Sequence, residues 1–131
     1  MATGENIRHV ANLIANHVGQ GYRVVAVVSA LDGVTDKLFE AAEQARKGKR
    51  DYIHEFKQNL LKAHLTAARK ATENKRIQEE VEQILKTTID ELEKVWTGII
   101  YVGELTPKSR DYILSFGERL SAPIVWGALD R

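Results

Sequence analysis

The feature that most constrains the fold is a short apolar run at residues 22–28, which reads Tyr-Arg-Val-Val-Ala-Val-Val. The run is rich in β-branched residues and is apolar at both odd and even positions. This pattern is typical of a strand that is buried on both faces, as in parallel sheets. Gly21 precedes the run, and a break at residues 29–33 follows it. The sequence therefore predicts one buried β-strand at residues 22–28.

A buried strand must pair its backbone N–H and C=O groups, yet no second run is equally convincing. Residues 99–102 are a weaker candidate, because the period of so short a run does not separate a strand from a helix. The missing partner strands would come from a longer polypeptide or from another copy of the chain. We therefore expect either a piece of a larger sheet or a homo-oligomer formed through the unpaired strand 22–28.

The rest of the chain has the apolar spacing of amphipathic helices. One helix is expected around residues 7–18, another from Thr35, and a helical hairpin at about 51–103. Thr106 and Pro107 suit the N-cap and first position of a last helix, which Pro123 is expected to kink or break. The predicted fold class is mainly α with one buried β-strand, in a single domain spanning residues 1–131.

Composition narrows the classes of function. The 131 residues are 44% hydrophobic and 28% charged, with a net charge of +1, which is an ordinary balance for a globular domain. We therefore expect no nucleic-acid or membrane partner, no membrane span and a cytoplasmic location. The basic run at residues 46–50 favours a solvated connection between helices over the alternative, a nucleic-acid contact.

Motifs for catalysis or metal binding are missing from the sequence. The absence of Cys excludes disulfides, thiolate zinc sites and cysteine nucleophiles. No two of the four histidines lie three or four residues apart, and no P-loop motif occurs. We therefore predict no metal site and no catalytic residue on these grounds.

Two segments outside these motifs are candidates for a functional site. Ser29 and Thr35 flank the loop after the predicted strand, where their hydroxyls and a helix N-terminus would form an anion site or an ordinary helix cap. In the last helix, Gly117 is costly unless another element packs closely against it. The adjacent Glu118 either points inward beside Leu114, where it needs a partner, or forms a surface pair with Arg119.

These same segments carry a resemblance to a known family. Residues 27–38 (Val-Val-Ser-Ala-Leu-Asp-Gly-Val-Thr-Asp-Lys-Leu) resemble the loop after the second strand of aspartokinases. Residues 104–123, which include Ser-Phe-Gly-Glu-Arg-Leu-Ser-Ala-Pro, resemble the second signature of that family. Residues 4–10 are similar to its first helix, so the resemblance covers nearly the whole chain.

Aspartokinases belong to the amino acid kinase family, so the resemblance implies a piece of a three-layer α/β/α fold. It also implies transfer of the ATP γ-phosphoryl group to the side-chain carboxylate of L-aspartate, on the route to lysine, threonine and methionine. Ser29, Thr35 and Glu118 match positions of the family's aspartate site. The resemblance implies ATP and Mg²⁺ as cofactors of the complete enzyme.

The sequence departs from the family pattern in ways that affect function. The family's first strand reads Lys-Phe-Gly-Gly-Thr-Ser-Val and serves the phosphates, but this run is missing, and Asp32 stands where a second glycine is common. Nothing here matches the family beyond the second signature. We therefore expect no ATP site, no tightly bound cofactor, weak or absent L-aspartate binding and no activity from this chain alone, which leaves open whether it is an enzyme. The alternative is a non-catalytic helical interaction or assembly module.

Overall fold

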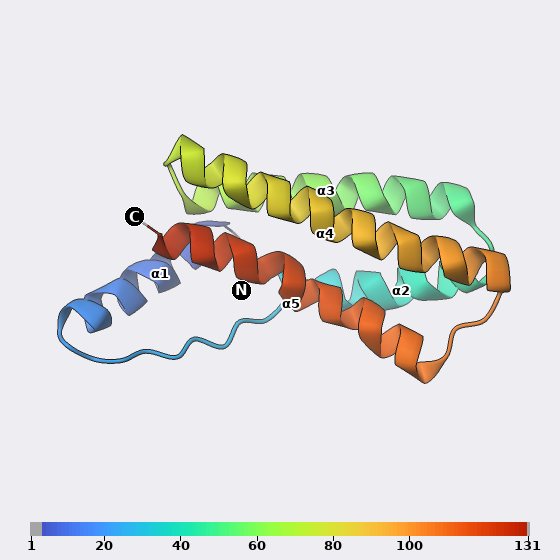
Figure 1. The fold of residues 1–131 in the computed structure, drawn as a ribbon, viewed down its shortest axis with the longest axis horizontal. Coiled ribbons are helices and arrows are strands. Elements are labelled where there is room, and N and C mark those ends of the chain that lie inside the picture. Colours follow the sequence, from blue (N-terminus) through green and yellow to red (C-terminus); the bar gives the residue numbers. More distant parts are fainter. Residues whose placement is uncertain (1–3, 131) are drawn as a thin grey trace.

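The computed structural model describes residues 4–130 and contains five helices in this range (Figure 1). The helices are α1 (Gly4–Gly19), α2 (Val34–Arg46), α3 (Arg50–Ala71), α4 (Lys75–Val102) and α5 (Pro107–Leu129). No residue of this range lies in a strand. The predicted fold class is therefore wrong in two respects, since neither the buried strand nor the α/β/α layering is present in the described residues.

Helices α3 and α4 lie side by side and run in opposite directions (Figure 1). Asn74 ends the short connection between them and caps α4, because its side chain accepts hydrogen bonds from the N–H groups of Arg76 and Ile77. Two ion pairs show the antiparallel register. Lys57 Nζ lies 2.8 Å from a Glu93 carboxylate oxygen, and Arg69 Nε lies 3.0 Å from one of Glu82.

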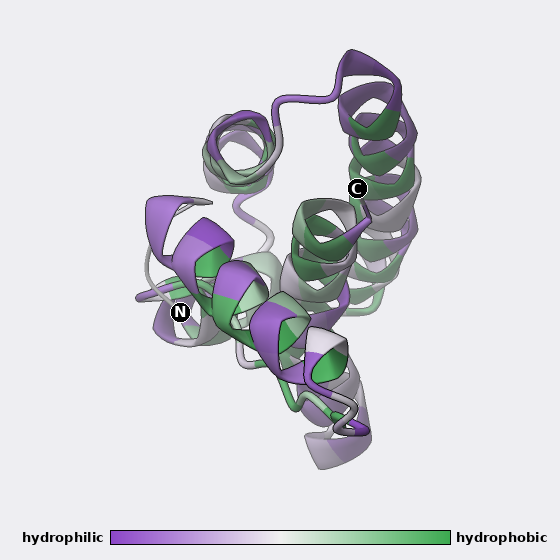
Figure 2. Cartoon of the chain, turned by 90° about the vertical axis from the view of Figure 1, so that its left-hand side faces the viewer, coloured by the Kyte–Doolittle hydropathy of each residue, from purple (hydrophilic) through white to green (hydrophobic). Residues whose placement is uncertain are grey.

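The hydrophobic core lies between these two helices and the other three, where α5 packs against α1, α2, α3 and α4. Figure 2 shows that the helices carry hydrophobic stripes alternating with hydrophilic ones. The largest side chains that are fully buried include Trp96, Phe116, Leu85, Leu92 and Leu120. Each helix satisfies its own backbone hydrogen bonds, so burial of these stripes is sufficient to hold the bundle together.

Residues 22–28 form an irregular trace rather than a strand (Figure 1). Val25 is 92% and Val27 is 95% exposed. Within residues 4–130, no backbone–backbone hydrogen bond involves residues 23–28. The physical reason is that a strand needs a partner at hydrogen-bonding distance, and no other part of the described chain offers one. The expected homo-oligomer through strand 22–28 is therefore not supported, because residues 22–28 form no strand.

Two alternatives that the sequence left open, a second strand at residues 99–102 and a break at Pro123, are not found in the structure. Residues 99–102 form the end of α4, where Ile99 accepts a hydrogen bond from the N–H of Gly103. Pro123 does not end the last helix, because α5 continues to Leu129. No helix formed by the described residues is both long and apolar enough to span a membrane.

Candidate functional site

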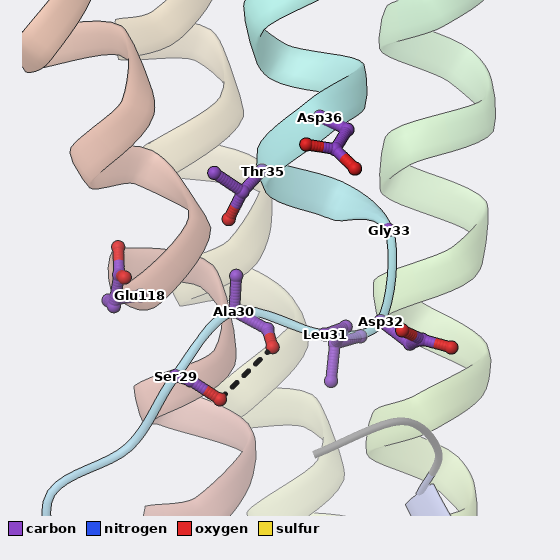
Figure 3. A pocket seen from close by; sticks show the side chains of 8 residues that line it. All are labelled: Ser29, Ala30, Leu31, Asp32, Gly33, Thr35, Asp36 and Glu118. Atoms are coloured by element: carbon purple, nitrogen blue, oxygen red, sulfur yellow. Dashed lines mark hydrogen bonds between the residues drawn. The ribbon is translucent and has the colours of Figure 1, made fainter.

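The three residues predicted to form a substrate site lie around one pocket. Ser29, Thr35 and Glu118 line a cavity of about 430 Å³ together with residues 30–33 and Asp36 (Figure 3). The loop before α2 provides one wall, the first turn of α2 a second, and α5 a third. The structure thus brings together side chains from distant parts of the sequence.

The wall formed by α2 begins at a glycine. Gly33 is the N-cap residue and has a φ of 76°, in the left-handed region that favours glycine. Thr35 is therefore not the cap but lies in the first turn, which no side chain caps. Asp32 has no positive φ, so the backbone here tolerates aspartate where aspartokinases often have a second glycine. The positive end of the α2 dipole is left facing the pocket.

The wall formed by α5 is positioned by its own N-terminus and by close packing. Thr106 caps α5 by accepting a hydrogen bond from the N–H of Ser109, and Pro107 follows as predicted. A Cβ atom at Gly117 would lie 2.8 Å from Ala30 Cβ, so the loop before α2 is the element that packs against this glycine. The Ser121 hydroxyl donates a hydrogen bond of 2.6 Å to the Ser29 carbonyl oxygen.

Glu118 adopts neither of the two arrangements left open by the sequence. Its side chain is exposed and lines the pocket instead of entering the core. Arg119 forms its ion pair with Glu91, at 2.6 Å, and that hydrogen bond raises the pKa of the Arg119 guanidinium. In Figure 3, Glu118 and Thr35 extend from neighbouring helices, and Ala30 lies on the loop below Thr35.

The charges around the pocket define what it can bind. Three carboxylates line it, from Asp32, Asp36 and Glu118, and none of its lining residues is Lys, Arg or His. Such a lining attracts an ammonium group, whereas a carboxylate is attracted only to the N-terminus of α2. The arrangement suits a small zwitterion bound with its ammonium group near Glu118.

The same lining does not fit a nucleotide or its metal ion. A triphosphate needs cationic groups or a glycine-rich cradle of N–H groups, and the pocket offers only the first turn of α2. No cluster of His, Asp and Glu residues with metal-binding geometry occurs among residues 4–130. The lining of this pocket therefore does not fit ATP or Mg²⁺.

The structure adds residues to the site that were not predicted from the sequence. Asp36 and Asp32 line the pocket, while Ala30 and Ser121 hold its walls together. Asp36 follows Thr35 directly in the sequence, so its position near the pocket could have been predicted from that of Thr35. By contrast, no local pattern shows that Ser121 reaches a carbonyl group 92 positions earlier in the chain.

Comparison with known proteins identifies the family of this chain. Residues 1–131 match the amino acid kinase family. Aspartokinase of Schizosaccharomyces pombe is 30% identical over 105 residues, covering 76% of this chain and 20% of that protein. Aspartokinase 2, chloroplastic, of Arabidopsis thaliana is 30% identical over 132 residues, covering 98% of this chain and 22% of that protein.

A third relative is the bifunctional aspartokinase/homoserine dehydrogenase 1, chloroplastic, of Zea mays. It is 25% identical over 131 residues, covering all of this chain and 14% of that protein. The chain thus spans about a fifth or less of the length of these relatives. The resemblance inferred from the loop before α2 and from α5 is confirmed: the chain belongs to the amino acid kinase family.

Proposed function

We propose that this chain carries part of the L-aspartate site of an aspartokinase and forms the N-terminal portion of its catalytic domain. One observation carries the proposal. Ser29, Thr35 and Glu118, which match aspartate-site positions of the family, line a single pocket although they lie in different elements. The relatives named aspartokinase support the choice of substrate. The cytoplasmic location expected from the sequence stays a prediction.

The charges of the pocket support a different position for each end of the substrate. The Glu118 carboxylate attracts the ammonium group of L-aspartate, which the carboxylates of Asp32 and Asp36 favour as well. One substrate carboxylate lies at the uncapped first turn of α2, beside the Thr35 hydroxyl, whereas the Ser29 hydroxyl donates to the Ala30 carbonyl oxygen at 3.4 Å in the absence of substrate. The other carboxylate has no cation among the lining residues to balance it. Binding by this chain alone should therefore be weak.

A titration with L-aspartate followed by amide NMR tests this proposal. We expect saturable shifts at residues 29–36 and 114–121 of the wild-type protein. The Glu118→Gln variant keeps the shape of the side chain but removes its charge, and should lose at least about tenfold in affinity, because a charge-assisted hydrogen bond is lost. Glu104→Gln, an exposed glutamate outside the pocket, is the matched control. The proposal fails if the two variants respond equally.

An activity assay tests a second part of the proposal. Incubation with L-aspartate, ATP and Mg²⁺, with hydroxylamine to trap an acyl phosphate, should give no product from this chain alone. The reason is that the pocket provides no cationic group for the triphosphate. Product that disappears in the Glu118→Gln variant would show that the chain completes a working kinase site by itself.

A second candidate function is a non-catalytic interaction module. One observation favours it: an apolar groove of about 390 Å³ lies between α1, α5 and residues 24–29, and the exposed Val25 and Val27 are among the residues that line it. This candidate predicts that neither the wild-type protein nor any variant responds to L-aspartate. The same titration therefore separates the two functions.

A further inference from the structure

Two small residues of α5 lie one helical turn apart, on the face that meets the loop before α2. Gly117 and Ser121 are both buried, and Ser121 is 0% exposed. Residues 29 and 30 of the loop contact this face directly. Glu118 follows Gly117 immediately in α5. A contact that holds the loop against Gly117 therefore also sets the position of the loop relative to Glu118.

Ser121 provides a polar connection at the point where the irregular segment 22–28 ends. Its hydroxyl donates to the Ser29 carbonyl oxygen at 2.6 Å, while the Glu118 carbonyl oxygen of its own helix lies at the longer distance of 3.3 Å. The bond to the loop is thus the shorter one, and it is partly buried, since Ser121 is buried and Ser29 is exposed. The carbonyl group of one predicted substrate-site residue is fixed directly to α5.

Gly117 provides a steric connection next to it. A Cβ atom at this position would lie 2.8 Å from Ala30 Cβ, which real side chains do not tolerate without movement, and 3.7 Å from Thr35 Oγ1. The missing side chain therefore allows the loop to approach α5 closely, whereas the distance to Thr35 is an ordinary van der Waals contact. A side chain at this position would displace Ala30 and the loop that leads into the first turn of α2, which carries Thr35.

We infer that Gly117 and Ser121 are positioning residues, which hold residues 29–35 against α5 and thereby set the spacing between Glu118, Thr35 and Ser29. Neither residue lines the pocket. Their effect on L-aspartate rests on the proposed function, whereas their effect on the loop does not. A test can therefore measure the two separately.

The test is a mutational cycle between Gly117 and Ala30, followed by amide hydrogen exchange and L-aspartate titration of the whole chain. Gly117→Ala should speed exchange of the Val34 and Lys37 amides at least about tenfold, because the added methyl group displaces the loop whose Leu31 and Gly33 carbonyl oxygens accept their hydrogen bonds. Exchange in the core of α4 should not change. Adding Ala30→Gly removes the atom that clashes, so the double variant should return to within about threefold of wild type.

Ser121→Ala gives an independent measurement of the same positioning role. It should shift the amide NMR signal of Ala30, which belongs to the same peptide group as the Ser29 carbonyl, whereas Ser115→Ala on the same helix should not, since the Ser115 hydroxyl donates to the Tyr112 carbonyl oxygen within α5. In the titration, Gly117→Ala should weaken L-aspartate binding about tenfold, and the double variant should restore it.

The outcomes separate the two proposals. Rescue by Ala30→Gly in both exchange and affinity supports both of them. Rescue in exchange without any wild-type response to L-aspartate supports the positioning role and contradicts the proposed function. A Gly117→Ala variant with wild-type exchange, or a double variant that is not rescued, overturns the positioning role whatever the titration shows.

Discussion

Helix α4 and the segment 22–28 are both rich in apolar residues, yet the structure treats them in opposite ways. In α4, Leu85, Leu92 and Trp96 are fully buried, whereas Val25 and Val27 of the segment are almost fully exposed. A helix satisfies its backbone hydrogen bonds internally and needs only a neighbour for its apolar stripe. A strand needs a second backbone as well. Apolar composition alone therefore does not determine whether a segment is buried.

The largest expected difference between the two regions is in the free energy of unfolding after the same Val→Ala substitution in each. Val81→Ala removes two methyl groups from a residue of α4 that is 1% exposed, and should lower the free energy of unfolding by about 2 kcal/mol. Val27→Ala should change it by less than about 0.5 kcal/mol. Urea denaturation of both variants measures the difference. Equal losses would mean that Val27 is buried in the folded protein.

The pH dependence of the free energy of unfolding tests the burial of His64 in the core. His64 in α3 is 0% exposed, and burial lowers its pKa from the ordinary value of 6.5, although a hydrogen bond between Nδ1 and the Leu60 carbonyl oxygen, 2.8 Å away, opposes the shift. The unfolded chain therefore takes up the proton first as the pH falls. The free energy of unfolding should decrease below about pH 6.5, by at most about 1.4 kcal/mol per pH unit for this one proton.

The control for this titration is a histidine on the same helix. His64→Leu should flatten the pH dependence between pH 6.5 and 5, whereas His54→Gln should preserve it because His54 is exposed. Denaturation curves at several pH values give the slopes. A His64→Leu variant with an unchanged slope would assign the titration to another group.

The smallest expected effect concerns two helical glycines. A Cβ atom at Gly98 in α4 meets nothing within 4 Å, so Gly98→Ala should stabilise the protein by about 0.5–1 kcal/mol through helix propensity. At Gly127 in α5 the same atom would lie 2.7 Å from a methyl group of Val81, so Gly127→Ala should destabilise it. Thermal unfolding should show shifts of opposite sign, and shifts of the same sign would contradict the packing described for α5.

These contrasts also explain how much of the fold was predictable. Residues 38–45, 53–68 and 77–99 have apolar spacing of helical period, and helices are present there because local periodicity reports directly on a helical face. The run 22–28 was correctly separated from the amphipathic helices. It was wrongly assigned as a strand because no sequence pattern shows whether a partner strand lies beside it.

The candidate site was predictable to a different extent. Ser29, Thr35 and Glu118 were chosen from the family resemblance, and the spacing of residues alone left both an anion site and a helix cap open. The orientation of Glu118 was not predictable, because the helical wheel places it near half-buried Leu114 while the folded helix exposes it to the pocket. The close approach of Ala30 to Gly117 joins distant parts of the chain, so only the fold reveals which element packs against that glycine.

The most direct test of the comparison is amide hydrogen exchange measured for residues 23–28 and for the core of α4 in one dilute sample. The account predicts that the amides of residues 23–28 exchange near the rate of an unstructured chain, because they form no backbone hydrogen bond within the described residues. Amides around Leu85 and Leu92 should exchange at least about a thousand times more slowly. Comparable protection in both regions would contradict the account, because it would show that residues 23–28 are paired in a strand.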